Sequence, residues 1–178
     1  MKTKNASGLL RVKNYLPWIF YVTSVVILTA MQMSPRCFPT IAFARPVPLV
    51  LFTVCVAALE GPLLGSVMGV VAGLLWDMFT TRVFGYYGLM LMLIGLTVGL
   101  LVQWLLRANF LSAMLLCAGG TLAYVLLDWL ICYVLFLREE MGAVLVKVYL
   151  PNALYTVALA PLVYLLVLAM ARFLRKQR

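Results

Sequence analysis

The sequence contains no histidine and few charged residues, with only 11% of its 178 positions charged. The lack of histidine excludes Ser-His and Cys-His nucleophile pairs and removes the commonest metal ligand. The four cysteines show no CxxC or similar spacing. Three of them lie within apolar runs, where cysteine behaves as a small hydrophobic residue. The sequence therefore predicts no disulfide framework, no metal site and no cofactor.

Apolar residues dominate what is present, at 66% of the chain with a mean hydropathy of +1.09. A soluble domain is about half apolar, so the surroundings of this chain must be lipid. The net charge of +9 is concentrated at the two ends. Basic clusters that flank apolar runs are topology signals beside anionic lipid headgroups, so we expect contact with membrane lipids and none with nucleic acid.

We expect one all-α membrane domain over residues 15–172, between a basic N-terminus (1–14) and a basic tail (173–178). The second of its spans is short for a membrane crossing, because Val47–Leu59 has only 13 residues. It could begin near Ile41 with Arg45 snorkelling, tilt into a thin part of the bilayer, or be re-entrant. The six expected spans are 15–33, 41–59, 62–79, 86–106, 110–137 and 151–171.

Basic residues set the expected orientation. With six spans both termini lie on one side, which then holds nine of the 14 lysines and arginines, and the other side holds five. The positive-inside rule places the richer side in the cytoplasm. A five-span arrangement would put one basic end outside, so we favour six spans with both termini cytoplasmic.

The stretch EGPLLGSVMGVVAGLLWD, residues 60–77, carries glycine at every fourth position. In lipid, helices associate through close packing and buried polar contacts, and small residues four apart let two backbones approach. The next apolar run offers a matching face, so we expect the two helices to pack tightly. The predicted packing residues are Gly61, Gly65, Gly69, Gly73, Gly88, Gly95 and Gly99.

Four polar residues are candidates for a structural or partner-binding role: Asp77, Arg82, Asp128 and Asn152. Asp77 ends the glycine series, where it could cap a helix, pair with Arg82, or anchor a loop that a partner recognises. Asp128 lies within an apolar run, where Tyr124 could donate a hydrogen bond to it. Alternatively, an aromatic belt formed with Trp129 would place Asp128 near the outer surface.

The block GSVMGVVAGLLWDMFTTRVFGYYGLMLMLIGLTVGLL resembles the MreD family of bacterial rod shape-determining membrane proteins. The shared pattern is a glycine-rich helix ending in Asp77, a short loop, and Gly85 and Gly88 at the start of the next helix. The last run, with Pro151, Asn152 and Pro161, is also similar to that family. The loop is a looser match, because Phe84 stands where many relatives have leucine.

The resemblance implies a non-enzymatic component of the cell-elongation machinery in the bacterial cytoplasmic membrane, which organises lateral peptidoglycan synthesis. Its implied partner is MreC, a single-span protein with a large external domain. Through MreC it would act on a RodA-type glycosyltransferase and a class B penicillin-binding protein. The resemblance also implies a fold like the membrane subunits of energy-coupling-factor transporters.

Three other functions each require features that can be sought in this sequence. A substrate-binding subunit of an energy-coupling-factor vitamin transporter would need an external polar pocket, which Asp77, Arg82, Asp128, Asn152 and Tyr155 could line. An intramembrane aspartyl hydrolase would need Asp77 and Asp128 to share a proton at close range. A channel would need more pore-lining polar groups than this chain offers.

Overall fold

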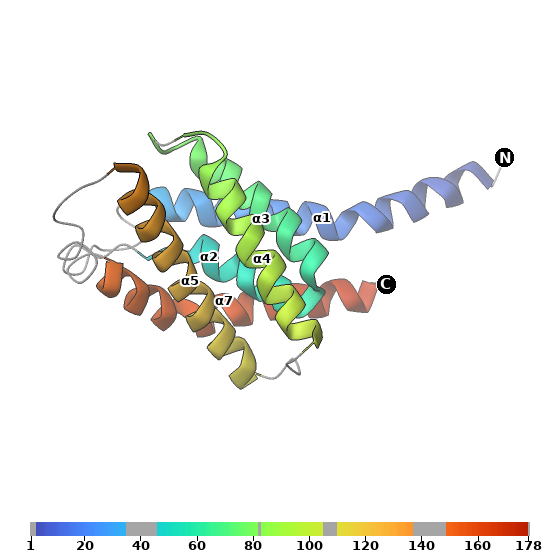
Figure 1. Ribbon diagram of the computed structural model, residues 1–178. Helices are drawn as coiled ribbons and strands as arrows, with labels where there is room; N and C mark the ends of the chain where they lie inside the picture. Colours follow the sequence, from blue (N-terminus) through green and yellow to red (C-terminus); the bar gives the residue numbers. More distant parts are fainter. Residues whose placement is uncertain (1–2, 35–45, 82, 105–109, 137–148, 178) are drawn as a thin grey trace.

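A computed structural model of the chain describes residues 3–34, 46–81, 83–104, 110–136 and 149–177, and these are almost entirely helical, with no strand among them (Figure 1). Apolar runs form helices here because a helix satisfies its own backbone hydrogen bonds, which lipid cannot do. The helices are α1 (Thr3–Met33), α2 (Pro48–Glu60), α3 (Pro62–Asp77), α4 (Tyr86–Trp104), α5 (Phe110–Phe136) and α7 (Leu150–Gln177).

The short helix α2 forms the centre of the bundle and contacts α1, α3, α4, α5 and α7. All residues from Pro48 to Ala57 are buried. Thirteen residues extend only about 20 Å, which is less than the thickness of a bilayer core. Because the longer helices enclose α2, it does not need to reach both membrane surfaces to be shielded. The possible extension over residues 41–45 lies outside the described residues.

Two free, buried thiols connect α2 to α5. The Sγ atoms of Cys55 and Cys117 lie 3.6 Å apart. Both side chains are fully enclosed, which agrees with their expected role as small hydrophobic residues.

The pair α3 and α4 has the most extensive contact of any two described helices. The turn before α3 is built on Gly61, whose φ of +101° suits glycine, and on Pro62 at the first helical position. The N–H of Gly61 donates to the carbonyl of Ala57 and so closes α2. Helix α3 ends at Asp77, two residues before the end of the span expected from hydropathy.

By length and composition, three described segments can cross a membrane: Tyr86–Trp104, Leu111–Cys132 and Leu150–Leu174. Their windows are less than half buried inside the protein, so many of their apolar side chains face outward, as lipid-facing side chains do. The apolar parts of α1, α2 and α3 are shorter, at 10–17 residues each. The membrane nature of the chain is thus supported, and the count of six spans stays a prediction.

The ends of the chain are more helical than expected. Helix α1 begins at Thr3, within the segment expected to be a polar tail, and its first part projects beyond the other helices (Figure 1). Helix α7 continues without interruption through Pro161 to Gln177. Both termini lie at the same end of the molecule in Figure 1. The loop between α3 and α4 lies at the other end of these two helices from the turn at Gly61.

Candidate functional site

Four glycines, Gly69, Gly73, Gly95 and Gly99, lie where the backbones of α3 and α4 meet, and a Cβ on Gly99 would collide with the backbone of Pro62. A Cβ atom on Gly69 would stand 2.5 Å from the carbonyl oxygen of Leu91, and one on Gly95 would stand 2.6 Å from the carbonyl oxygen of Gly65. A Cβ on Gly73 would collide with the backbone of Gly88. Real Cβ atoms do not approach so closely, so this contact requires hydrogen in place of a side chain at each position.

The other glycines of the predicted set have different surroundings. A Cβ on Gly65 would meet Ala57 of α2. Gly88 would tolerate a Cβ, which would make ordinary contacts with Leu74, the nearest at 3.4 Å. Gly61 is a correction to the sequence-based set, because it lies in the turn with nothing within 4 Å of an added Cβ. Its spacing matches the packing glycines, but its backbone conformation gives it a turn role.

Asp77, at the end of α3, caps the start of α4. One carboxylate oxygen accepts hydrogen bonds from the N–H groups of Gly85 (3.0 Å) and Gly88 (3.2 Å), and the other accepts from the N–H of Tyr87 (3.2 Å). The first N–H groups of a helix have no partner within it, and an acidic side chain there also suits the helix dipole. Asp77 is only 3% exposed. This carboxylate therefore fixes the α3–α4 loop as well as the helix.

The loop itself is held by short local turns. The N–H of Thr80 donates to the Asp77 carbonyl at 3.2 Å, and that of Tyr86 donates to the Val83 carbonyl at 3.2 Å. Gly85 has a φ of +93°, a conformation that directs its N–H toward Asp77 with little steric cost. Arg82, the expected ion-pair partner of Asp77, lies outside the described residues.

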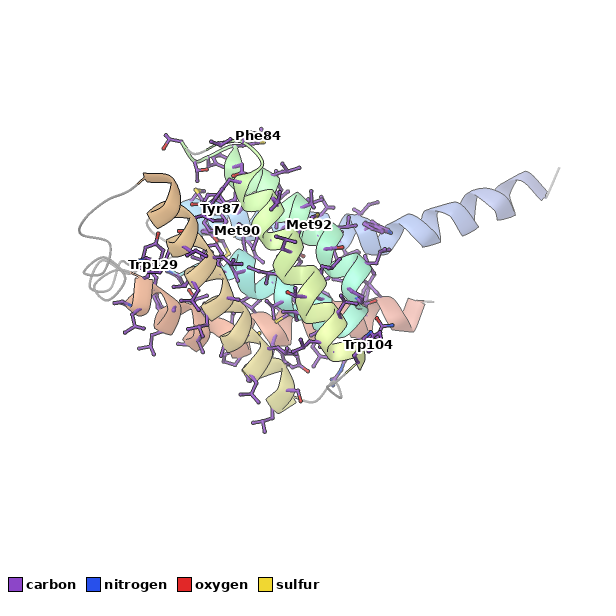
Figure 2. The ribbon with its side chains drawn as sticks, viewed as in Figure 1. Phe84, Tyr87, Met90, Met92, Trp104 and Trp129 are labelled. Carbon is purple, nitrogen blue, oxygen red and sulfur yellow. The ribbon has the colours of Figure 1, made fainter. Side chains whose placement is uncertain are left out.

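Apolar side chains are exposed along this loop: Met78, Phe79, Val83 and Phe84. Val83 is 81% exposed and Phe84 is 68% exposed. Figure 2 shows Phe84 on the loop at one end of the bundle, while Tyr87, a few residues later, is buried among the helices. The fixed loop thus presents a small apolar surface beyond the helix ends.

Asp128 is buried and links three helices. Its two carboxylate oxygens accept hydrogen bonds from the Tyr86 hydroxyl (2.9 Å) and the Tyr149 hydroxyl (2.7 Å). Tyr86 begins α4 and Tyr149 directly precedes α7. The ring of Tyr124, the donor suggested by the sequence, lies 6.0 Å from that of Trp76. Neither Tyr86 nor Tyr149 could be predicted as a partner of Asp128, because both are far from it in the chain.

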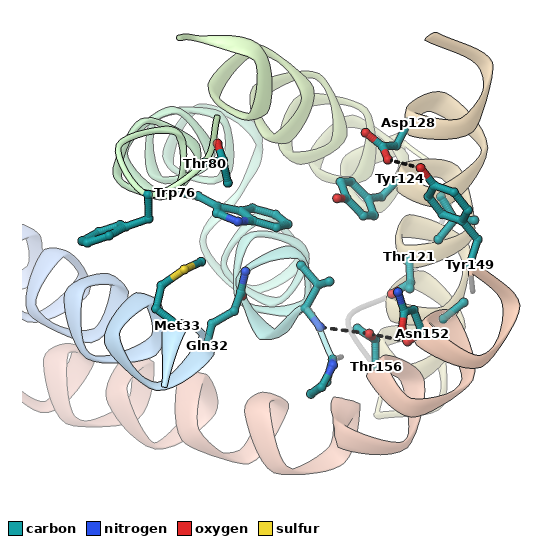
Figure 3. Close-up of a pocket in the computed structure, with 15 residues that line it drawn as sticks. Gln32, Met33, Trp76, Thr80, Thr121, Tyr124, Asp128, Tyr149, Asn152 and Thr156 are labelled. Atoms are coloured by element: carbon teal, nitrogen blue, oxygen red, sulfur yellow. Dashed lines mark hydrogen bonds between the residues drawn. The ribbon is translucent and has the colours of Figure 1, made fainter. Parts of the chain in front are cut away.

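A cavity of ≈ 500 Å³ lies beside Asp128, between the ends of several helices (Figure 3). Its walls combine apolar and aromatic side chains with hydroxyl and amide groups from α1, α3, α5 and α7. Asn152 and Asp128 line it, as the pocket hypothesis expected, whereas Asp77 and Tyr155 are absent from its described lining. Asp77 and Asp128 are held by different donors, so their arrangement offers no support for an aspartyl dyad.

The first turn of α2 also borders this cavity. The N–H of Val47 donates to the Thr156 hydroxyl at 3.1 Å, and the same hydroxyl donates to the Asn152 carbonyl at 2.7 Å. The N–H of Leu49 donates to the Gln32 side chain at 3.5 Å. Side chains from α7 and α1 thereby cap the central helix, which has no capping side chain of its own.

Comparison with known families decides the relationship of this chain. The model of the family described as rod shape-determining protein MreD matches residues 12–176. The chain belongs to the MreD family. MreD proteins are shape-determining membrane proteins and not a known enzyme family, which favours a rod-shape component over a vitamin-transporter subunit. No curated protein and no solved structure matches the chain, so the expected likeness to energy-coupling-factor subunits stays a prediction.

Proposed function

We propose that this MreD-family chain is a non-enzymatic component of the rod-shape machinery that binds MreC and helps to organise lateral peptidoglycan synthesis. In this proposal the chain crosses the cytoplasmic membrane six times, with both termini in the cytoplasm. The α3–α4 loop then lies on the external side, where the large domain of MreC is expected. A RodA-type glycosyltransferase and a class B penicillin-binding protein are reached indirectly through MreC.

The observation that carries the proposal is the apolar surface of the α3–α4 loop. Exposed apolar side chains on the flank of a membrane helix face lipid and need no partner. Val83 and Phe84 are instead part of a connecting loop beyond the helix ends, where exposed apolar groups commonly mark an interaction site. Asp77 fixes the backbone that carries them, so little conformational entropy is lost when a partner binds.

The glycine contacts hold together the helices that carry this loop surface. The α3–α4 pair packs backbone to backbone at Gly69 and Gly73, and α3 also rests on α2 through Gly65. Two backbones in contact leave no free space between them, so neither helix can shift without displacing the other. We assign these glycines the role of a rigid frame for the loop.

The proposal is tested by affinity capture of the tagged chain from cells that make MreC. The double variant V83A/F84A should recover several-fold less MreC than the unaltered chain. L63A is the matched control, because Leu63 is also highly exposed, at 76%, but lies at the opposite end of α3. All three chains must reach the membrane in equal amounts. Equal MreC recovery from V83A/F84A and the unaltered chain would refute the loop as the binding surface.

A further inference from the structure

One wall of the ≈ 500 Å³ cavity carries a buried hydrogen-bond donor that the protein does not use. Trp76 is only 7% exposed, and its indole N–H has no acceptor in the part of the chain that the structure describes. The indole nitrogen of a buried tryptophan usually finds a partner, because a buried donor without an acceptor costs free energy. Trp76 lines the cavity, so an acceptor inside the cavity would satisfy it.

The indole of Trp76 is held in place by its neighbours. Its ring stacks on Tyr87 with centroids 4.1 Å apart and an interplanar angle of 11°, and the ring of Tyr124 lies 6.0 Å away. Figure 3 shows the indole extending into the cavity from one side, with Tyr124 and Asn152 on the other. These contacts limit rotation of the ring, so the N–H cannot readily turn away to another acceptor.

A second donor lines the same cavity. Gln32, near the end of α1, accepts a hydrogen bond with its side-chain oxygen from the N–H of Leu49 (3.5 Å). The NH₂ group of this side chain has no acceptor among the described residues. Figure 3 shows Gln32 on the same side of the cavity as Trp76. Two donors from different helices, α1 and α3, thus face a shared space.

A carbonyl oxygen suits two such donors. It has two lone pairs and no proton, so it can accept from both at once. The described threonines of the lining do not compete for it, because each donates its hydroxyl to a backbone carbonyl: Thr80, Thr121 and Thr156. Apolar side chains such as Val47 and Val125 also line the cavity and suit hydrocarbon attached to the carbonyl.

The cavity lies close to the depth at which membrane-spanning helices end. Asn152 lines it from the first turn of the apolar segment Leu150–Leu174, and Trp76 lines it from the last turn of α3. Met33 and Phe79 also line the cavity and are 36% and 64% exposed, so the cavity reaches the protein surface. The ester groups of bilayer lipids lie at this level, just outside the hydrocarbon core.

We propose that the cavity binds the ester carbonyl of a glycerolipid, with the indole N–H of Trp76 and the amide of Gln32 as donors and the acyl chain against the apolar side chains. The lipid enters beside Met33 and Phe79. Both donors are uncharged, so binding places no requirement on the charge of the headgroup. This role goes beyond capture of MreC, because the loop side chains proposed for MreC do not line the cavity.

The test compares diester and diether phospholipids that share headgroup and chain length, because an ether lacks the carbonyl oxygen. The full chain in detergent receives an equal mixture of the two lipids, and native mass spectrometry measures how much of each is retained. W76F removes the indole donor, and Q32M removes the amide donor. W104F is the matched control, because Trp104 ends α4, is 85% exposed and does not line the cavity.

Nuclear magnetic resonance reports on the donor directly. The chain has four tryptophans, so few indole N–H signals appear after isotope labelling of tryptophan, and the signal missing from W76F is that of Trp76. A hydrogen bond deshields the indole proton. The Trp76 signal should therefore lie at higher frequency in nanodiscs of the diester lipid than in nanodiscs of the diether lipid.

We expect the unaltered chain and W104F to retain the diester lipid roughly fivefold better than the diether lipid, as for one net hydrogen bond. W76F should lose most of this preference, and Q32M should lose part of it. Equal retention of the two lipids by the unaltered chain would overturn the proposal. A Trp76 signal at the same frequency in both nanodiscs would also overturn it, because water would then be the acceptor.

Two further outcomes would count against the cavity. Loss of the preference in W104F would place the lipid on the outer surface of the protein, where exposed tryptophans meet the membrane interface. If W76F fails to fold, an unchanged preference in Q32M would overturn the proposal, because Gln32 supplies the second donor.

Discussion

Replacement of Asp77 by alanine should lower the free energy of unfolding, because Asp77 is the acceptor for three backbone N–H groups. In D77A, three backbone N–H groups lose their acceptor. The N–H of Gly85 is part-buried and can turn to water, whereas those of Tyr87 and Gly88 are buried. Each buried donor left unsatisfied costs about 1–3 kcal/mol. The two buried N–H groups together should lower the unfolding free energy by about 2–4 kcal/mol, since the backbone can shift and recover part of the loss.

The variant D77N refines this prediction. Asparagine keeps one acceptor oxygen of the same shape but places an NH₂ group against the remaining backbone donor. It should therefore lose about 1–2 kcal/mol, between the unaltered chain and D77A. Since asparagine is a good capping residue, a part of the α4 cap should survive in this variant.

The measurement is reversible unfolding in mixed micelles, titrated with a denaturing detergent and followed by circular dichroism. E60Q serves as the control, because Glu60 is half-buried at the other end of the α2–α3 pair and should change stability by less than about 0.5 kcal/mol. If D77A unfolds within about 0.5 kcal/mol of the unaltered chain, the carboxylate is not a significant cap and the reasoning from its three hydrogen bonds is wrong.

Three further results are expected. G73A should lower thermal stability by several degrees because its Cβ would strike the backbone of α4, whereas G119A, which has open space, should be neutral or slightly stabilising; equal melting of the two would contradict the packing argument. Y149F removes one hydrogen bond to buried Asp128 and should cost about 1–3 kcal/mol in the micelle titration, with no loss if the bond is unimportant. T156V removes the cap at Val47 and should speed hydrogen exchange in the first turn of α2, while an unchanged rate would show that the cap is dispensable.

The close contact of α3 and α4 follows from features that can be read in the sequence. Glycines four residues apart on both helices indicate that two backbones meet, and this is local information. Gly61 shows the limit of that signal, because spacing cannot distinguish a packing glycine from one that adopts a positive φ in a turn. Gly88 shows another limit, since a Cβ there would make only ordinary contacts of 3.4 Å or more with Leu74, although the backbone of Gly88 itself lies against Gly73.

The central position of α2 was harder to predict. A segment buried among helices and a segment facing lipid are equally apolar, so hydropathy describes both in the same way. Only its length, 13 residues, indicated something unusual about this run. The structure resolves the question through packing, because every residue from Leu49 to Ala57 is enclosed by other helices.

The polar network around the two buried aspartates could be predicted only in part. A capping role for Asp77 was one expected possibility, but its donors lie 8, 10 and 11 residues away and depend on the loop conformation. Tyr149 lies 21 residues from Asp128 and Tyr86 lies 42 away. Such contacts depend on how the helices pack. Residues this far apart in the chain show no spacing pattern by which the contact could be predicted from one sequence.

Two adjacent tyrosines connect the two aspartates. The backbone N–H of Tyr87 bonds to Asp77, and the side-chain hydroxyl of Tyr86 bonds to Asp128. The start of α4 is therefore anchored to α3 by one carboxylate and to α5 by another. A displacement of the loop must stretch one of these hydrogen bonds, each of which has a carboxyl oxygen as its acceptor. The loop surface and the cavity are thus held in a fixed relation by a single dipeptide.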